Sequence, residues 1–418
     1  MKVVGLVTEY NPFHNGHMYH LNKAKEITDS DFSVAIMSGN FLQRGEPALL
    51  DKWTRTKMAI DNGVDLVIEL PVIYACQSAE YFAYGAIRLL DSLGVVDYLC
   101  FGSELGETEN LNKIATILNN EPKDFKLLLK EHLDKGLPFP KARTNAIIDY
   151  IKKSNENISM EDIINILSNP NNILGVEYLK ALNKINSKIV PTTIKRKSAQ
   201  YNSISIEGNI ASATAIRKKL LDNDISIIKN TVPNITYHHL IEALKKYNSF
   251  NSLKNYNDLL LYLIRTTSTE SIKELLDVDE GLENRIIEFG SKYNEINKIL
   301  DGIKTKRYTY TRLQRIMMHL LLGLDKNKLF NFYKEEPLYI RVLGFNKKGI
   351  KILNKAKKVS SFPIITKFAN YKNINNSLLH KVIQYDKRAT DIYYLGLKKF
   401  NNKKTNLDYL ISPYFNLN

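Results

Sequence analysis

Cysteine and long apolar runs are both scarce in this chain of 418 residues. Its two cysteines, Cys76 and Cys100, provide neither a disulfide framework nor the spacing of a zinc site, and their apolar surroundings are typical of buried free thiols. The first apolar segment, of about six residues, is too short for a secretion signal or a membrane span. There is also no internal repeat, coiled coil or low-complexity linker. We therefore expect a soluble cytoplasmic protein with no membrane partner.

Acidic residues are scarce too, but only in the last part of the chain. Residues 301–418 contain 24 Lys and Arg against 7 Asp and Glu, whereas residues 1–150 contain 15 against 20. Because aromatic side chains can stack on unpaired bases, a basic region interleaved with Tyr and Phe predicts a polyanionic partner and favours RNA. The alternative is a general lysine bias with a merely solvated surface, and the acidic first part argues against it.

The segment 3–20, VVGLVTEYNPFHNGHMYH, carries the strongest local signal. It predicts a buried strand, a short Asn/Pro loop, and a helix that begins at about Asn15 or Gly16. His14 and His17 would lie side by side at the helix N-terminus, where unpaired N–H groups and the helix dipole favour an anion. Two histidines at this spacing can be incidental, but their place after the first strand favours phosphate binding.

Strand-like and helix-like segments alternate through the first half of the chain. The predicted strands cover 2–8, 32–37, 64–70, 95–101 and 188–194, and the predicted helices cover 16–28, 52–62, 78–93, 174–186 and 210–221. This rhythm predicts an α/β fold with a parallel sheet and helices on both faces. Since ligands bind beyond the carboxyl ends of such strands, the loops 9–16, 38–46 and 102–104 should form one site.

Two polar segments near the fifth predicted strand have more than one reading. Asn171 and Asn172 precede a helix and can serve simply as its caps. The basic run 195–197 leaves the end of that strand, which favours contact with a nucleotide over a solvated surface.

The helix over 210–221 has a similar ambiguity at its start. Ser212 and Thr214 are predicted to cap it through their hydroxyl groups, and capping alone explains them. Arg217 in the first turn also fits a second phosphate-binding site.

From about residue 236 onward the strand rhythm disappears and helices dominate. Helices are predicted over 237–247, 257–266, 270–276 and 282–299, and the rest of the chain contains short mixed segments without an assignment. We expect a catalytic domain over 1–230 with a helical insertion at about 108–165, and a mainly helical, basic region over 231–418 that binds RNA.

The motif His14-Asn15-Gly16-His17 resembles the HxGH signature of the nucleotidylyltransferase superfamily. The longer strings GLVTEYNPFHNGH, MSGNFLQRGEPALLDKWTR, FGSE, PNNILGVEYLKAL, TIKR and SATAIR are similar to the bacterial tRNA(Met) cytidine acetate ligase family. The resemblance is strong to about residue 219 and weaker beyond. It implies a Rossmann-like nucleotidylyltransferase domain, ATP-dependent activation of acetate to acetyladenylate, and acetyl transfer to N4 of the wobble cytidine of elongator tRNA(Met). Such a ligase would use Mg²⁺ and release AMP and pyrophosphate.

The resemblance also implies site residues. His14, His17 and Arg196 would stabilise charge during catalysis. The implied ATP-binding set is Val7, Thr8, Glu9, Tyr10, Asn11, Pro12, Phe13, His14, Asn15, Gly16, His17, Met18, Tyr19, His20, Gly102, Asn171, Asn172, Arg196, Lys197, Thr214 and Arg217. Within it Asn171 is favoured over Asn172, and Lys197 is a weaker neighbour because the sequence diverges after Arg196.

Two more expectations concern the surroundings of the nucleotide. A side chain at Gly16 would obstruct the approach of the phosphates. By the rule on strand ends, Gln43, Arg44 and Glu46 are placed on the side of the acceptor. No metal-ligating residues are assigned.

Two other functions use the same residues. A nucleotidylyltransferase that adenylylates a phosphorylated metabolite would use the identical first motif, but would leave the basic region unexplained. A non-catalytic tRNA-binding protein would bind tRNA in a salt-dependent way without turning over ATP. An aminoacyl-tRNA synthetase fits less well, because no lysine-rich KMSKS-type loop follows the predicted sheet.

Overall fold

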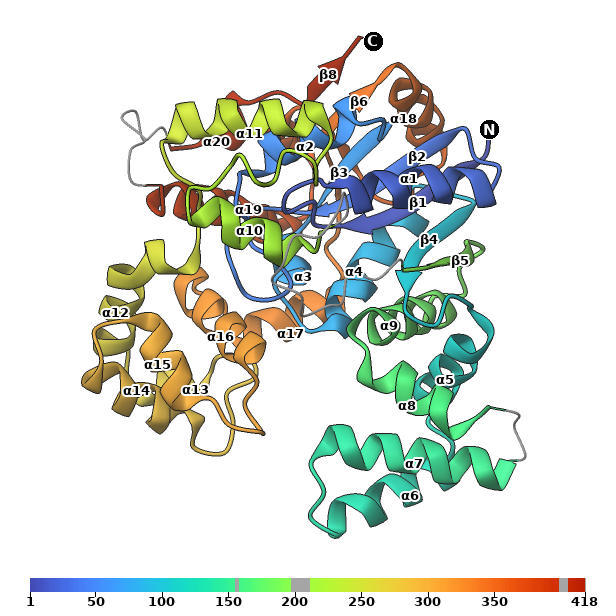
Figure 1. Ribbon diagram of the computed structural model, residues 1–418, viewed down its shortest axis with the longest axis vertical. Helices are drawn as coiled ribbons and strands as arrows, with labels where there is room; N and C mark the ends of the chain where they lie inside the picture. Colours follow the sequence, from blue (N-terminus) through green and yellow to red (C-terminus); the bar gives the residue numbers. More distant parts are fainter. Residues whose placement is uncertain (155–157, 197–210, 398–404, 418) are drawn as a thin grey trace.

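The computed structural model describes residues 1–154, 158–196, 211–397 and 405–417 (Figure 1). Its strands are β1 (Val3–Thr8), β2 (Phe32–Ser38), β3 (Leu66–Leu70), β4 (Tyr98–Ser103), β5 (Val190–Lys195), β6 (Ile340–Asn346), β7 (Ile364–Ile365) and β8 (Tyr414–Asn416). They form one sheet in the order β5-β4-β1-β2-β3-β6-β7, with β8 also paired to β6. β1 to β5 pair in parallel, as expected. The predicted α/β fold is confirmed.

The helices of the first half are α1 (Asn15–Ile27), α2 (Lys52–Asp61), α3 (Val72–Ala75), α4 (Ala79–Ser92), α5 (Glu109–Asn120), α6 (Lys123–Asp134), α7 (Phe139–Ser154), α8 (Met160–Ser168), α9 (Pro170–Lys184) and α10 (Ala213–Leu221). Those that follow are α11 (Asn234–Tyr247), η1 (Leu253–Tyr256), α12 (Asn257–Thr266), α13 (Thr269–Lys273), α14 (Leu282–Lys292), α15 (Ile296–Ile303), α16 (Tyr310–Leu322), α17 (Lys326–Glu335), α18 (Lys347–Val359), η2 (Phe368–Asn373), α19 (Ser377–Leu395) and α20 (Leu407–Leu410). No helix of the described residues is both long and apolar enough to cross a membrane.

The central strands explain why the sheet forms where it does. β3 is buried along its whole length, and β2 is buried beyond its first residue. Nearly continuous apolar runs of this kind are typical of parallel strands covered on both faces. α1 packs on β1, and α2 packs on β3 and β6; the chain then reverses direction, and α4 packs on β2 and β3 from the opposite face. The strand order therefore reverses between β1 and β4, and sheets of this kind bind ligands beyond the carboxyl ends of the strands at such a point.

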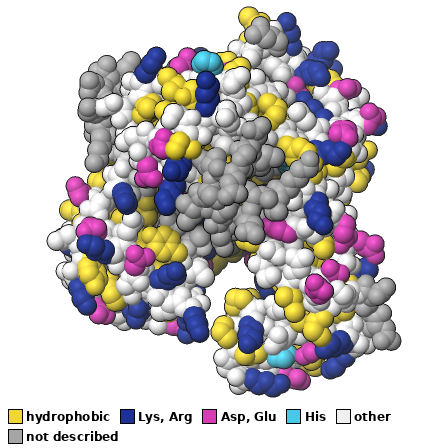
Figure 2. Space-filling model, viewed as in Figure 1, with side chains coloured by type: hydrophobic (Ala, Val, Ile, Leu, Met, Phe, Trp, Pro, Cys, Tyr) yellow, Lys and Arg dark blue, Asp and Glu magenta, His cyan; other side chains and the backbone are white. Residues whose placement is uncertain are grey.

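Two groups of helices extend from the sheet (Figure 1). α5 to α9 lie beside β4 and β5, with the α6–α7 hairpin farthest away, and α12 to α16 form a second, purely helical lobe. Figure 2 shows a hollow between the ends of these two groups.

Residues after 236 are mainly helical, as expected, but the short segments left without an assignment include three strands of the sheet among the described residues. β6 pairs antiparallel with β3, and β7 and β8 pair with β6, so the sheet includes residues on both sides of position 230. A lone apolar segment after a long helical stretch has no strand rhythm around it, and it is recognised as a strand only through its pairing with β3. The division into 1–230, with its insertion at 108–165, and 231–418 stays a prediction.

The prediction of a single helix over 282–299 is wrong, because α14 ends at Lys292 and α15 begins at Ile296. Tyr293 between them is extended. The Ile296 N–H donates to the Asn257 Oδ1 of α12 at 2.8 Å, so a distant side chain caps the second helix. Both cysteines are free and buried, as expected.

Candidate functional site

The two histidines of the first motif hold the start of α1 together. His14 is the N-cap residue: its Nδ1 accepts a hydrogen bond from the Gly16 N–H at 3.0 Å. The His17 Nδ1 accepts from the His14 N–H at 3.3 Å, and the two rings stack with their centroids 3.7 Å apart. This is a capping box made by two imidazoles. Because Nδ1 is the acceptor in each, a neutral ring carries its proton on Nε2. That N–H can be offered to an anion, which at His17 would replace a hydrogen bond to the Pro12 carbonyl.

Burial and neighbouring cations keep these rings neutral. Burial, with Arg196 and Arg217 nearby, lowers the pKa of His14 to about 3. Burial, then His14, His20 and Arg196, lowers the pKa of His17 well below its usual value, and a hydrogen bond to the Pro12 backbone offsets only part of this. At neutral pH the histidines therefore act as N–H donors, and the two arginines supply the positive charge.

Gly16 leaves space for the His14 ring. A Cβ at this position would lie 2.9 Å from the His14 Cε1 and 3.0 Å from its Nδ1. The predicted obstruction therefore begins with the imidazole itself, before any phosphate is considered.

Pro170, Asn171 and Asn172 form the start of α9, and the two asparagines bind the loop after β4. Asn172 is completely buried, and its Oδ1 accepts from the N–H groups of Glu104 at 2.8 Å and Leu105 at 3.1 Å. The Glu104 carboxylate in turn accepts from the Asn171 Nδ2 at 2.6 Å and the Asn172 N–H at 2.9 Å. The predicted capping role is wrong, because the N-cap of α9 is Asn169 and Pro170 occupies the first turn.

Asn171 is the asparagine that faces Arg196. The Arg196 Nη1 donates to the Asn171 Oδ1 at 3.4 Å, and the Arg196 main-chain N–H donates to the Ser103 carbonyl at 2.9 Å. A Cβ on Gly102 would lie 3.3 Å from the Arg196 Cγ, so the glycine makes room for this side chain. The geometry agrees with the preference for Asn171 over Asn172, and ATP contact by either stays a prediction.

Arg217 connects three segments that are far apart in sequence. Its Nη1 donates to the Asn11 carbonyl at 3.2 Å, and its Nη2 lies 3.3 Å from the Glu46 Oε1 and 3.4 Å from the Thr214 Oγ1. Ser212 caps α10 as predicted, through the Ala215 N–H at 3.1 Å. Thr214 is not a cap, because it already lies within the first turn.

The loop after β2 closes the other side of the site. The Gln43 N–H donates to the Glu9 Oε1 at 2.9 Å. Gly45 has φ +76°, and a Cβ there would lie 2.2 Å from the Arg315 nitrogen, so the loop rests directly on the backbone of α16. The loops after β1, β2 and β4 therefore meet at one edge of the sheet, as the rule on strand ends predicts.

Several residues of the segment 7–20 have supporting positions. Tyr10 and Phe13 are buried, with their ring centroids 5.0 and 5.7 Å from that of His17. The His20 Nε2 is buried without a hydrogen-bond partner within the described residues, and burial followed by Arg196 lowers its pKa to about 4. Lys197 lies outside the described residues.

Arg55 is a residue that sequence reasoning missed. It is completely buried, and it donates to the carbonyls of Leu50 at 3.0 Å, Glu9 at 2.7 Å and Ser38 at 3.0 Å, and to that of Gly39. It thus joins the ends of β1 and β2. Its helical spacing to the apolar Met58 and Ala59 was the one sign that it faces inward.

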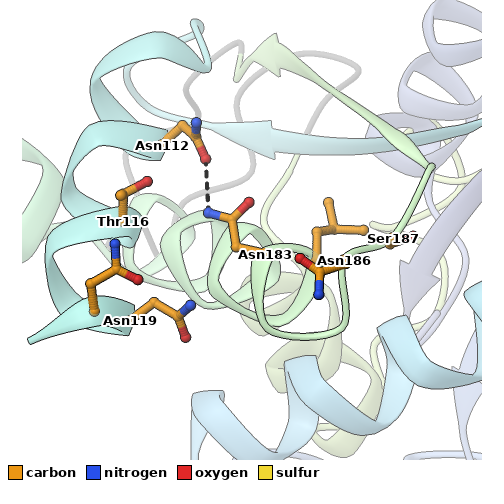
Figure 3. Close-up of a pocket in the computed structure, with 8 residues that line it drawn as sticks. Asn112, Thr116, Asn119, Asn183, Asn186 and Ser187 are labelled. Atoms are coloured by element: carbon orange, nitrogen blue, oxygen red, sulfur yellow. Dashed lines mark hydrogen bonds between the residues drawn. The ribbon is translucent and has the colours of Figure 1, made fainter.

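A cavity of about 500 Å³ lies away from this edge, between α5 and the end of α9 (Figure 3). It is lined by Asn112, Thr116, Asn119, Asn120, Leu182, Asn183, Asn186 and Ser187. The last two precede β5, so the cavity lies near the amino end of that strand, opposite the loops described above.

Comparison with known proteins gives consistent matches over the whole chain. The family model described as HIGH Nucleotidyl Transferase matches residues 1–408. The tRNA(Met) cytidine acetate ligase of Alkaliphilus metalliredigens is 46% identical over 421 residues, 99% of each chain. That of Caldanaerobacter subterraneus subsp. tengcongensis is 49% identical over 401 residues, 96% of each.

Two crystal structures of Thermotoga maritima TmcAL, each 35% identical to this chain, are similar in fold. The apo form has a TM-score of 0.96 with 100% of both chains covered. The form bound with alpha-thio ATP has a TM-score of 0.93 with 99% of both covered.

Proposed function

The chain belongs to the HIGH nucleotidyl transferase family and, within it, to the tRNA(Met) cytidine acetate ligase family, and we propose that it performs that reaction. It activates acetate with ATP and transfers the acetyl group to N4 of the wobble cytidine of elongator tRNA(Met). The observation that carries the proposal is the pair of neutral histidines at the start of α1, with Arg196 and Arg217 beside them. The ATP analogue in the similar Thermotoga maritima structure supports it.

In the first step, an oxygen of acetate attacks the α-phosphorus of ATP and pyrophosphate leaves. The triphosphate lies at the N-terminus of α1, where the Nε2–H groups of His14 and His17 donate to its oxygens. Arg196 and Arg217 neutralise the charge that develops on them. Catalysis is then positioning and charge stabilisation, without a covalent enzyme intermediate.

Mg²⁺ is expected to accompany ATP, since it is normally held largely through substrate phosphates, and it would neutralise charge on the departing pyrophosphate. Among the described residues there is no cluster of three or more His, Cys, Asp or Glu that could hold a metal ion, and we assign it no ligand from the chain.

In the second step, N4 of the cytidine attacks the acetyl carbon, and AMP leaves with the electron pair of the broken C–O bond. Bases in an anticodon loop are accessible at small cost. The loop with Gln43, Arg44 and Glu46 is the proposed acceptor side, because Arg217 joins Glu46 to the Asn11 carbonyl in the loop before α1.

The basic region supports tRNA as the acceptor. Lys304, Lys306 and Arg307 are exposed between α15 and α16. Tyr308 is buried, with the Arg312 guanidinium 5.3 Å from its ring centroid, so it is not available to stack on a base. With tRNA as the substrate, we place the protein in the cytoplasm.

The proposal is tested by incubating the protein with ATP, labelled acetate and total tRNA, and then digesting the RNA to nucleosides. Labelled N4-acetylcytidine is the expected product, and reactions without ATP serve as the control. Formation of acetyladenylate without labelled RNA would contradict the proposed second step. If pyrophosphate were released with a phosphate ester such as nicotinamide mononucleotide but not with acetate, an adenylyltransferase would be the correct assignment; tRNA binding without ATP turnover would leave only the binding protein.

Gly16→Ala is expected to separate activity from stability. The added Cβ displaces the His14 ring, so acetate-dependent ATP–pyrophosphate exchange should fall on the order of 10-fold, as a small misplacement of a catalytic group costs. Stability should not fall, because alanine favours the helix by up to about 1 kcal/mol over glycine. Exchange assays and thermal unfolding measure the two effects, with Asn22→Ala on the exposed face of α1 as the control. Equal exchange by both variants would show that the His14 ring has room to adjust.

A further inference from the structure

Glu9 is a fixed carboxylate at the end of β1. It is half-buried, and it follows directly after the last residue of that strand. Its Oε1 accepts from the Gln43 N–H at 2.9 Å, and its carbonyl accepts from the buried Arg55 at 2.7 Å. Among the described residues, no hydrogen bond is donated to its Oε2.

The carboxylate lies in the same charged environment as the histidines. Arg217 lowers the pKa of both His14 and Glu9, so one guanidinium is close to the phosphate-binding rings and to this carboxylate. Arg217 also contacts the carbonyl of Asn11 and the carboxylate of Glu46. These contacts hold the Glu9–Gln43 pair and the loop before α1 around one guanidinium, and we place the acetyl group of the adenylate beside that pair.

Charged groups from several elements affect the pKa of Glu9, and Glu9 in turn affects the pKa of neighbouring groups. Burial raises the pKa of Glu9, and the hydrogen bond from Gln43 lowers it. The negative charge of Glu46 raises this pKa, and the positive charges of Arg217 and Arg44 lower it. The pKa is raised as a result. The pKa of the buried Cys76 thiol is raised by burial, lowered by Arg315 of α16 and raised by Glu9. The pKa of Tyr178 on α9 is raised by burial and then by Glu9. The loop that binds the Glu9 carboxylate through the Gln43 N–H also rests on the backbone of α16 at Gly45.

We propose that Glu9 accepts the proton that the acceptor amine loses during acetyl transfer, an inference that rests on the proposed function. The exocyclic amine of cytosine is a weak nucleophile because its lone pair is delocalised into the ring. A carboxylate is the usual acceptor for its N–H. As N4 attacks the acetyl carbon, the N4 proton passes to Oε2, the carbon–oxygen bond to the phosphate breaks, and AMP leaves with that electron pair. Glu9 ends as a carboxylic acid and returns its proton to water.

This assignment gives Glu9 a role in the second step, in addition to its place in the implied ATP-binding set. A general base works best when its pKa is near the working pH, and burial moves Glu9 in that direction. The Gln43 hydrogen bond and the two arginines keep the ionised form accessible. The first step needs no base, because acetate is already ionised, so only the second step should depend on this proton transfer.

Glu9→Gln tests the proposal, because glutamine keeps an acceptor for the Gln43 N–H but cannot take a proton. Because Glu9 belongs to the implied ATP-binding set, acetate-dependent ATP–pyrophosphate exchange is measured on the same variant, and acetyl transfer should fall much further than exchange. In single-turnover reactions with preformed acetyladenylate, acetyl transfer to tRNA should fall by about 10²-fold, the contribution of a general base. Wild-type transfer should decline as the pH falls through the raised pKa of Glu9, and the variant should lose this dependence. Glu9→Asp, which keeps a carboxylate, should recover part of the rate and covers the case in which the glutamine variant does not fold.

Glu80→Gln provides the matched control, since this α4 carboxylate is 64% exposed and lies outside the site. Both half-reactions should match those of the wild type. Transfer by Glu9→Gln at the wild-type rate, or an equal loss in both half-reactions, would overturn the role of Glu9. A wild-type protein that forms no acetylcytidine would instead refute the proposed function, so the two failures are distinguishable.

Discussion

Replacing His17 with alanine should lower acetate-dependent ATP–pyrophosphate exchange on the order of 10² to 10³-fold, as the removal of one donor from a preorganised anion site does. The variant loses the Nε2–H that we assign to the oxygens of the triphosphate. It also loses the stack on His14 and the acceptor for the His14 N–H. The remaining imidazole is then less well oriented, so the loss should appear mainly in kcat.

His132→Ala is the control for this prediction. His132 lies on the distant α6–α7 hairpin, where its Nε2 is 2.8 Å from the Asp149 carboxylate, so exchange should be unaffected. The double variant His14→Ala/His17→Ala should be little worse than either single one, because residues that act as a unit are not additive. Full exchange by His17→Ala would show that the phosphates bind elsewhere.

The second large effect concerns stability. Lys52 is completely buried, and its Nζ lies 2.8 Å from Glu69 and 2.7 Å from Asp408. Burial lowers the pKa of Lys52, but Asp408 and Glu69 outweigh it and the pKa is raised. This lysine is therefore charged in the folded protein. Its contribution to stability is fully present below about pH 10.4, the unfolded value, and is lost as the pH rises through the folded pKa.

Lys52→Met should lower the free energy of unfolding by about 3–5 kcal/mol at neutral pH, the cost of removing one partner from a buried ion pair. Two buried carboxylates would then share the nearby Arg341 alone. Urea unfolding measures the change. Lys23→Met is the matched control, because the Lys23–Glu26 pair is largely exposed and such pairs contribute about 0–1 kcal/mol.

A triple variant completes the test. Adding Glu69→Gln and Asp408→Asn to Lys52→Met removes the uncompensated charges, so part of the lost stability should return. If Lys52→Met were no more destabilising than Lys23→Met, the buried cluster would not be holding an ion pair. Because Asp408 lies near the C-terminus and Lys52 begins α2, this cluster also joins the last segment of the chain to the edge that carries the site.

The α/β fold could be predicted because its signals are local. Apolar runs as short as LVIEL, alternating with amphipathic segments, define β1 to β5 and the helices between them. The histidine pair could be predicted for the same reason, since both residues belong to one strand–loop–helix unit and their contacts span three residues. The residue types of this unit also predict a helix N-terminus after the loop, and a helix N-terminus favours an anion.

Only the tertiary structure decided the rest, because its contacts join residues far apart in the chain. β6 is a strand because it pairs with β3, and nothing near it in sequence indicates that pairing. Arg55 became part of the site through carbonyls of two different strands. Arg217 meets Glu46 across 171 residues, and Glu9 is held by the backbone of another loop. Sequence periodicity therefore determined the sheet and its phosphate-binding helix, whereas which charges surround the reacting groups depended on long-range packing.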